Sequence, residues 1–177
     1  MTGKTIWTIG HSTHPLEEFV LMLQSFQVEL VADIRSYPGS KRYPHFNIEA
    51  LRVSLPAEGI GYTHIKDLGG RRPALPDSKN TGWRLAAFRG YADYMETPPF
   101  RKAIKLLEEL AATQRVAYMC SEAVWWSCHR SLVSDWLKHK GWTVMHIMGI
   151  GKSQEHPYTA PARIVGGKLV YSEASLF

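Results

Sequence analysis

Short apolar runs of strand length alternate along this chain with segments in which apolar residues recur at helical spacing. The short runs predict strands at residues 5–9, 28–34, 62–65, 115–119 and 142–148. The helical spacing predicts helices at residues 16–23, 48–54 and 85–95, and a fourth that starts at Thr97-Pro98. A fifth helix is expected to have Ser127 as its N-cap and to end at Gly141.

This alternation favours an α/β fold with a mostly parallel sheet flanked by helices on both faces. The 177 residues suit a single domain, so we assign residues 1–177 to one unit. Residues 163–171 surround Gly166-Gly167 and predict a small C-terminal antiparallel hairpin. We expect this hairpin to add an antiparallel edge to the sheet.

Residues 66–82 are polar and rich in glycine and proline. They are interpreted as a long surface loop within the domain, because a loop of this length often covers a binding site. We expect it to act as a lid over a pocket.

Polar side chains follow several of the predicted strands. His11 follows the first strand, Asp33 and Arg35 close the second, and Cys120 and Glu122 follow the fourth. The carboxyl ends of parallel strands share one edge of the sheet, so residues distant in sequence would meet there in one crevice.

Several of these segments together resemble the bacterial domain-of-unknown-function family 488. The segments are Thr8-Ile9-Gly10-His11-Ser12, Asp33-Ile34-Arg35 with Pro38 and Ser40, Leu68-Gly69-Gly70, Tyr91-Ala92-Asp93-Tyr94-Met95, Met119-Cys120-Ser121-Glu122 and Cys128-His129-Arg130. The resemblance extends from Thr5 to about His156. It implies no activity, since the family is defined by sequence, and function has to be argued from the residues.

Both cysteines lie between Met119 and Arg130, next to the start of the predicted fifth helix. A cysteine at a helix N-terminus beside arginine or histidine should have a lowered pKa, and Cys128 fits this description better than Cys120. Cys128 is therefore a candidate nucleophile. A reversible redox pair and two purely structural cysteines are the alternatives.

Cys120, Cys128 and His129 are also candidate ligands for zinc or iron. Seven residues separate the two cysteines, which is longer than the two-residue gap of a zinc knuckle. A metal site would therefore have to be assembled from separate strand ends.

A small anion is the ligand that the arginines favour. Arg35 and Arg130 are candidate clamps, with Ser12 and Tyr37 as further substrate-binding residues. Candidates for proton transfer are His11, Asp33, Glu122 and His129. The alternative is that Asp33 pairs with Arg35, and Glu122 with Arg130, only to order the loops.

The formal charge of +5 and the pI of about 9.2 favour anionic partners. Aromatic residues interleaved with basic ones could stack on the bases of a single strand; they are Tyr37, Tyr43, Phe46, Trp83, Trp125 and Trp126. No apolar run has the length of a signal peptide or a membrane span, so we expect a cytoplasmic protein that does not enter a membrane and whose cysteines are reduced.

The leading hypothesis is an enzyme that acts on a small anionic or nucleotide-like substrate at the carboxyl edge of the sheet. The first alternative is a nucleic-acid-binding module without catalysis. The second is a metal or redox sensor built on cysteine and histidine.

Overall fold

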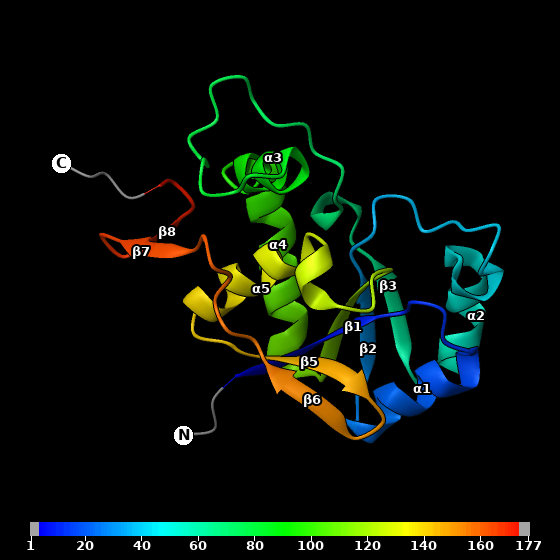
Figure 1. Cartoon of the computed structure of the whole chain (residues 1–177). Helices are drawn as coiled ribbons and strands as arrows, with labels where there is room; N and C mark the ends of the chain where they lie inside the picture. The colour runs from blue at the N-terminus through cyan, green and yellow to red at the C-terminus, as the bar shows by residue number, and fades with distance from the viewer. Residues whose placement is uncertain (1–3, 174–177) are drawn as a thin grey trace.

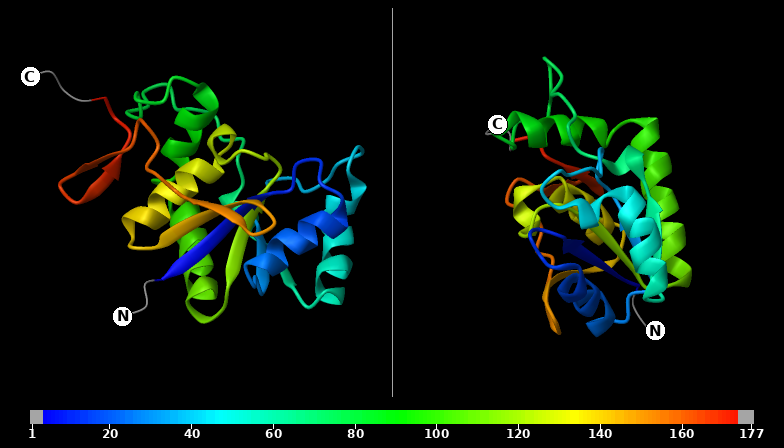
Figure 2. Two further views of the ribbon diagram at one scale, coloured as in Figure 1. Left: turned by 60° about the horizontal axis from the view of Figure 1, so that its bottom comes forward. Right: turned by 90° about the vertical axis from the view of Figure 1, so that its right-hand side faces the viewer.

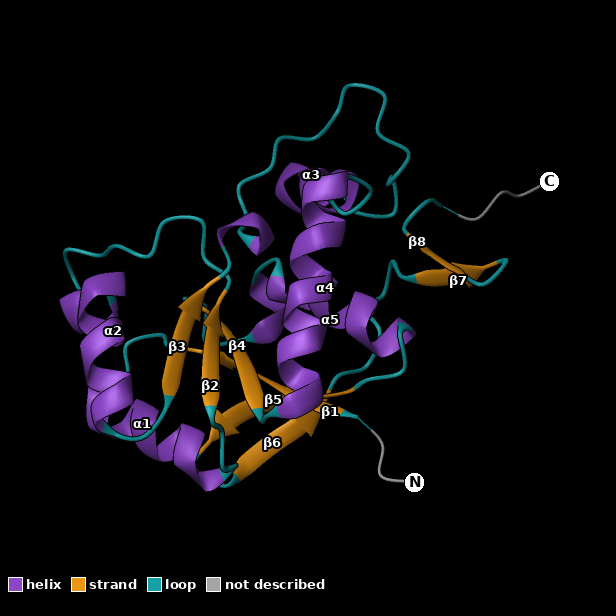
Figure 3. Ribbon diagram, turned by 180° about the vertical axis from the view of Figure 1, so that it is seen from behind, coloured by secondary structure: helices purple, strands orange, loops and turns teal. Residues whose placement is uncertain are grey.

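A six-stranded sheet forms the centre of the computed structural model, which describes residues 4–173. Its strand order is β3-β2-β4-β1-β5-β6, and neighbouring strands are parallel except for β5 and β6 (Figure 3). The strands are β1 (Thr5–Gly10), β2 (Leu30–Asp33), β3 (Gly61–His64), β4 (Val116–Cys120), β5 (Thr143–Gly149) and β6 (Lys152–Glu155). The predicted α/β class is confirmed.

Helices cover both faces of this sheet (Figures 1 and 2). They are α1 (Leu16–Ser25), α2 (Ile48–Ala57), α3 (Ala86–Tyr94), α4 (Pro98–Thr113) and α5 (Arg130–His139). Successive residues of a strand point to opposite faces of the sheet, so neighbours belong to different apolar clusters. Trp7 packs with α1 and α2, whereas Ile6 packs with α3, α4 and α5. Within residues 4–173, no helix has both the length and the apolar character needed to span a membrane.

The antiparallel edge of the sheet is β6, and the expectation that the C-terminal hairpin supplies it was wrong. The hairpin does form, from β7 (Arg163–Val165) and β8 (Lys168–Val170), but these strands make a separate two-stranded sheet that stands apart from the central one (Figure 1). The four residues of β6 are polar and exposed, so they lack the apolar signal of a strand. Pairing with β5 makes them a strand.

The start of α5 also differs from the prediction. Ser127 ends a short 3₁₀ turn, Trp125–Ser127, and the helix begins at Arg130 with His129 as its N-cap residue. The backbone of Cys128 is extended between the two, and its carbonyl accepts hydrogen bonds from the backbone and side chain of Ser131. Cys128 therefore lies just before the helix and faces its first turn.

The long loop after β3 is anchored to α3. Its first residues form a 3₁₀ turn, Lys66–Leu68, and Asp93 of α3 then accepts hydrogen bonds from Leu75, Ser78 and Asn80. The backbone of the loop also lies directly on the helix, because a Cβ added at Gly90 would be 1.8 Å from the carbonyl oxygen of Arg72. These contacts fix the end of the loop that reaches the carboxyl edge of the sheet.

The loops after β1 and β4 lie against each other at that edge. The backbone N–H groups of His11 and Ser12 donate to the carbonyls of Cys120 and Ser121, at 3.0 and 2.9 Å. Gly10 allows this close approach, since a Cβ at that position would lie 1.6 Å from the carbonyl oxygen of Glu122.

We predict that Gly10→Ala destabilises the protein by about 3 kcal/mol, because the added methyl group forces the two backbones apart. The measurement is the free energy of unfolding in urea. Gly39→Ala is the matched control, because a Cβ at Gly39 meets no atom within 4 Å and should leave stability nearly unchanged. Equal stability of the two variants would contradict this account of Gly10.

Candidate functional site

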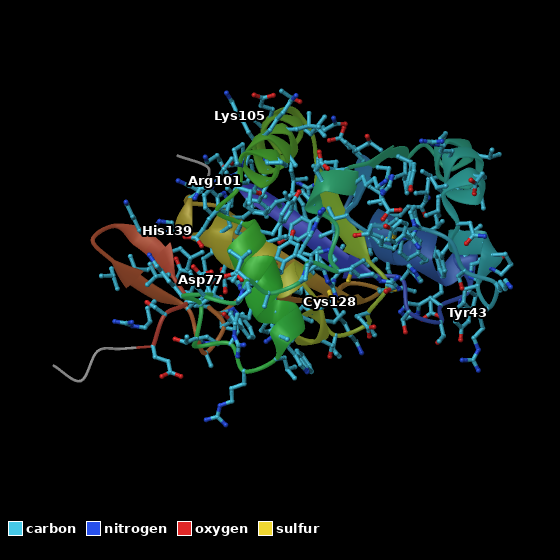
Figure 4. All side chains as sticks on the ribbon, turned by 90° about the horizontal axis from the view of Figure 1, so that it is seen from above. Tyr43, Asp77, Arg101, Lys105, Cys128 and His139 are labelled. Atoms are coloured by element: carbon cyan, nitrogen blue, oxygen red, sulfur yellow. The ribbon has the colours of Figure 1, made fainter. Side chains whose placement is uncertain are left out.

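A pocket of about 840 Å³ opens at the carboxyl edge of the sheet. The loops after β1, β2 and β4 form its wall, together with Gly70 and Arg71 of the long loop and the first turn of α3. Figure 4 views the molecule from above and labels Cys128 and Tyr43, which both line the pocket. The edge is the one at which the sequence predicts a crevice.

Most of the candidate residues meet in this pocket. Those on its wall are His11, Ser12, Arg35, Tyr37, Cys120, Glu122, Cys128 and His129. The other two candidates, Asp33 and Arg130, lie behind the wall and are almost fully buried. Residues that follow β1, β2 and β4 are therefore brought together. They form two layers, the pocket wall and a buried layer behind it.

The two cysteines are adjacent free thiols. Their sulfur atoms are 2.8 Å apart, with Cys120 buried and Cys128 half-buried. Burial by itself favours the neutral thiol, yet the hydrogen bond with Cys128 and the charge of Arg130 outweigh it and lower the pKa of Cys120 to about 7. Burial and the neighbouring Cys120 raise the pKa of Cys128. Near neutral pH the pair therefore holds one proton between two sulfurs.

Arg130 stands behind this pair as a fully buried cation. Its two terminal nitrogens donate to Thr8 Oγ1 at 3.1 Å and to the carbonyl of Glu122 at 2.9 Å, and its backbone N–H points to Cys128 Sγ at 3.4 Å. Burial opposes the charge on the guanidinium, but the sulfurs of Cys120 and Cys128 raise the pKa of Arg130. Arg130 therefore contacts Cys128 through its backbone and the loop through its guanidinium, and it does not form part of the pocket surface.

Asp33 and Arg35 form a buried ion pair at the end of β2. The Nε and Nη2 atoms of Arg35 donate to the two carboxylate oxygens at 2.9 and 2.7 Å, and the hydroxyl of Tyr62 donates to the same carboxylate. The carboxylate faces these partners and not the pocket. Asp33 is thus placed to orient Arg35, which lies on the pocket wall.

His11 is held neutral beside Arg35. Its Nδ1–H donates to the carbonyl of Ser12 at 2.9 Å, which leaves Nε2 to accept from Arg35 Nη1 at 3.1 Å. Burial, reinforced by the charge of Arg35, lowers the pKa of His11 to about 4. The His11 ring also stacks on the ring of Phe46, with the two ring centres 4.3 Å apart, and these contacts together fix its orientation.

His129 is neutral for the same reason. Its Nε2–H donates to the carbonyl of Ile34 at 2.8 Å, and burial lowers the pKa of the ring to about 4. The other nitrogen, Nδ1, is therefore an acceptor without a partner among residues 4–173, and it lies on the pocket side close to Gly70. Glu122 is exposed at the rim, and its backbone carbonyl is the part that engages Arg130.

Arg71 lies on the pocket wall, although it is not among the site residues predicted from the sequence. It is exposed, has a positive φ of 61° and lies 5.7 Å from the ring centre of Tyr37. Tyr37 itself is 68% exposed, and the Nζ atom of Lys66 lies over its ring, 5.8 Å from the ring centre. The Arg71-Arg72 pair in a glycine-rich loop was the available signal, but only the folded loop shows that it reaches the pocket.

The aromatic residues proposed for stacking fall into three groups, and Tyr43 and Trp83 form the half-buried one. Trp125 and Phe46 are buried, and Trp125 stacks on His146. Tyr37 and Trp126 are exposed. Fewer aromatic side chains than expected are thus free to meet a nucleic acid base.

The side chains that could bind a metal do not cluster in the described residues. Within residues 4–173, no three His, Cys, Asp or Glu side chains form a group that could hold a metal ion. Zinc or iron at Cys120, Cys128 and His129 stays a prediction.

Comparison with known proteins gives one family match. A family model described as "Domain of unknown function DUF488" matches residues 15–137, which span α1 to α5 and include the second, third and fourth strands. No curated protein and no solved structure matches the chain.

We predict that the cysteine pair reacts with iodoacetamide with a pH midpoint near 7, because one sulfur is a thiolate there. Cys120→Ser removes the sulfur whose pKa is lowered, and burial raises the pKa of the remaining Cys128, so the alkylation midpoint should lie above that of the wild-type pair and labelling at pH 7 should slow by about tenfold. Cys128→Ser should remove most labelling, since Cys120 is buried. Peptide mass mapping identifies the labelled residue, and a wild-type midpoint near that of an ordinary thiol would contradict the prediction.

Proposed function

The chain belongs to the domain-of-unknown-function family 488, and we propose that its pocket is the active site of an enzyme that acts on a small anionic substrate through a cysteine thiolate. The observation that carries this proposal is the pair of sulfurs, 2.8 Å apart on the pocket wall, with the guanidinium of Arg130 beside them. A buried cation next to two thiols stabilises a thiolate, which is the reactive form of cysteine.

Cations on the pocket surface support an anionic substrate. Arg71 is exposed on the wall, and Arg35 has one Nη1 hydrogen left after its bonds to Asp33, Phe46 and His11. The cavity has the size of a typical small-molecule site. The exposed ring of Tyr37 beside Arg71 also suits a nucleotide-like substrate, because a base can stack on it.

Cys128 is the nucleophile in this proposal, because it is the more accessible sulfur of the pair. When the shared proton lies on Cys120, the Cys128 thiolate forms a bond to the electrophilic atom of the substrate. The leaving group departs with the bonding electron pair and takes the proton from Cys120.

Water then attacks the covalent intermediate and releases the product with the Cys128 sulfur as leaving group. Nδ1 of His129 is the free acceptor that takes the proton of the water, and the neutral ring is available for this at pH 7. Asp33 acts on this site only through Arg35.

The anion pocket is tested by comparing iodoacetate with the neutral iodoacetamide on the same sulfur. We expect the ratio of the iodoacetate rate to the iodoacetamide rate at Cys128 to exceed the same ratio for glutathione. Arg71→Gln should reduce the iodoacetate rate about fivefold and leave the iodoacetamide rate unchanged. Arg84→Gln is the matched control, because Arg84 is exposed but lies off the pocket. Equal loss in both variants, or none, would exclude an anion site at Arg71.

A second candidate function is thiol–disulfide exchange, which the same 2.8 Å contact favours. The Cys128 thiolate would attack a substrate disulfide and release one thiolate, which takes the proton of Cys120. Cys120 would then attack Cys128, forming the internal disulfide and releasing the second thiolate.

Glutathione disulfide distinguishes this second function. In exchange chemistry the wild type ends as the internal disulfide, which no longer reacts with iodoacetamide until dithiothreitol is added. Cys120→Ser should stop as the mixed disulfide of Cys128 with glutathione, as seen by intact mass. A wild-type protein that also stops as the mixed disulfide would exclude the exchange function.

A further inference from the structure

A continuous chain of buried polar side chains runs behind the cysteine pair. It joins Asp135 of α5 to His156, His146 of β5 and Thr8 of β1, and it ends on Arg130. The successive distances are 2.8, 2.8, 2.6 and 3.1 Å. All five side chains are buried, and the pocket wall contains none of them.

The two ends of the chain set the direction of its two end hydrogen bonds. Arg130 can only donate, so Thr8 Oγ1 accepts from it. Asp135 only accepts, so His156 donates to it through Nε2. In the arrangement in which every donor points toward Asp135, Thr8 donates to His146 Nδ1 and His146 donates through Nε2 to His156 Nδ1.

His146 is held neutral within this chain. Burial, followed by the neighbouring His156 and Arg130, lowers the pKa of its ring to about 2. Trp125 stacks on the ring of His146 and keeps water from it.

The chain bears on the site through the orientation of Arg130. Within the described residues, Arg130 Nε has no hydrogen-bond partner, so the guanidinium is oriented by its two terminal nitrogens. One of them is held by the carbonyls of Glu122 and Ala123, and the other by Thr8. The titratable groups that face the cysteines are Tyr91, Tyr118, Glu122, His129 and Arg130, and the cation among them is Arg130.

We propose that Asp135, His156, His146 and Thr8 are positioning residues that hold the guanidinium of Arg130 against the two cysteines and so maintain the thiolate. The role of the thiolate rests on the proposed function. The negative charge of Asp135 polarises each hydrogen bond of the chain in turn, and this makes the hydroxyl of Thr8 a stronger acceptor for Arg130. Asp135 itself is fixed by Thr159 and Tyr171.

The test uses the pH dependence of alkylation by iodoacetamide in Thr8→Val, which keeps the shape of the side chain but removes both hydrogen bonds. We expect the midpoint to rise by about one pH unit, so that alkylation at pH 6.5 slows about tenfold. Thr8→Ser retains the hydroxyl and should restore the wild-type profile. A merely structural role would lower stability in Thr8→Val without moving this profile.

Ser78→Ala is the matched control for lost stability. It removes a hydrogen bond of 2.6 Å to Asp93 of α3, which is not part of the chain from Asp135 to Arg130, so the melting temperature should fall while the alkylation midpoint stays in place. If Thr8→Val does not fold, His156→Leu and His156→Gln give the same comparison two links further along the chain, because glutamine can both donate and accept there.

The outcomes separate the two proposals. A wild-type midpoint near 7 that Thr8→Val leaves unchanged overturns the positioning role, while the reactive cysteine pair stands. A wild-type midpoint near 8.5, as for an ordinary thiol, removes the proposed thiolate function and with it the positioning role. A midpoint near 7 that rises in Thr8→Val and returns in Thr8→Ser supports both.

Discussion

The buried guanidinium of Arg130 is the contact on which the arrangement of the site depends. It ties three parts of the molecule together: Thr8 in the central strand β1, the loop after β4 through the carbonyl of Glu122, and α5, on which it stands. A buried cation needs several partners to offset its desolvation, and here they come from different elements. The position of the loop, and hence of the sulfurs, follows from satisfying this one charge.

The buried part of the site combines charged groups that are surrounded by hydrogen-bond partners with imidazoles that are neutral. Asp33 and Asp135 are each surrounded by donors, and Arg130 by carbonyl and hydroxyl oxygens. The imidazoles of His11 and His146 are neutral because burial lowers their pKa, so they form hydrogen bonds without adding charge. The ionisable side chains on the pocket wall include Arg35, Arg71, Glu122 and the cysteine pair.

The sequence could locate the site because both signals involved are local. Apolar runs marked the parallel strands, and polar residues such as His11 and Arg35 directly followed them, so the rule that parallel strand ends share an edge was sufficient. The same logic failed for β6, which is polar and depends on β5 for its structure. It also misplaced the start of α5, because an extended Cys128 interrupts a pattern that looks continuous in the sequence.

The sequence by itself determined the fold class, the family segments and the set of residues at the carboxyl edge, since periodicity and the alternation of strands and helices along the chain are properties of neighbouring positions. The tertiary structure decided how those residues are divided between the pocket wall and the layer behind it. Thr8 and His146 are 138 positions apart, and Thr8 and Arg130 are 122 apart. Contacts over such separations leave no local pattern, so the contact between the sulfurs and the chain behind Arg130 become apparent only after the strands are placed side by side.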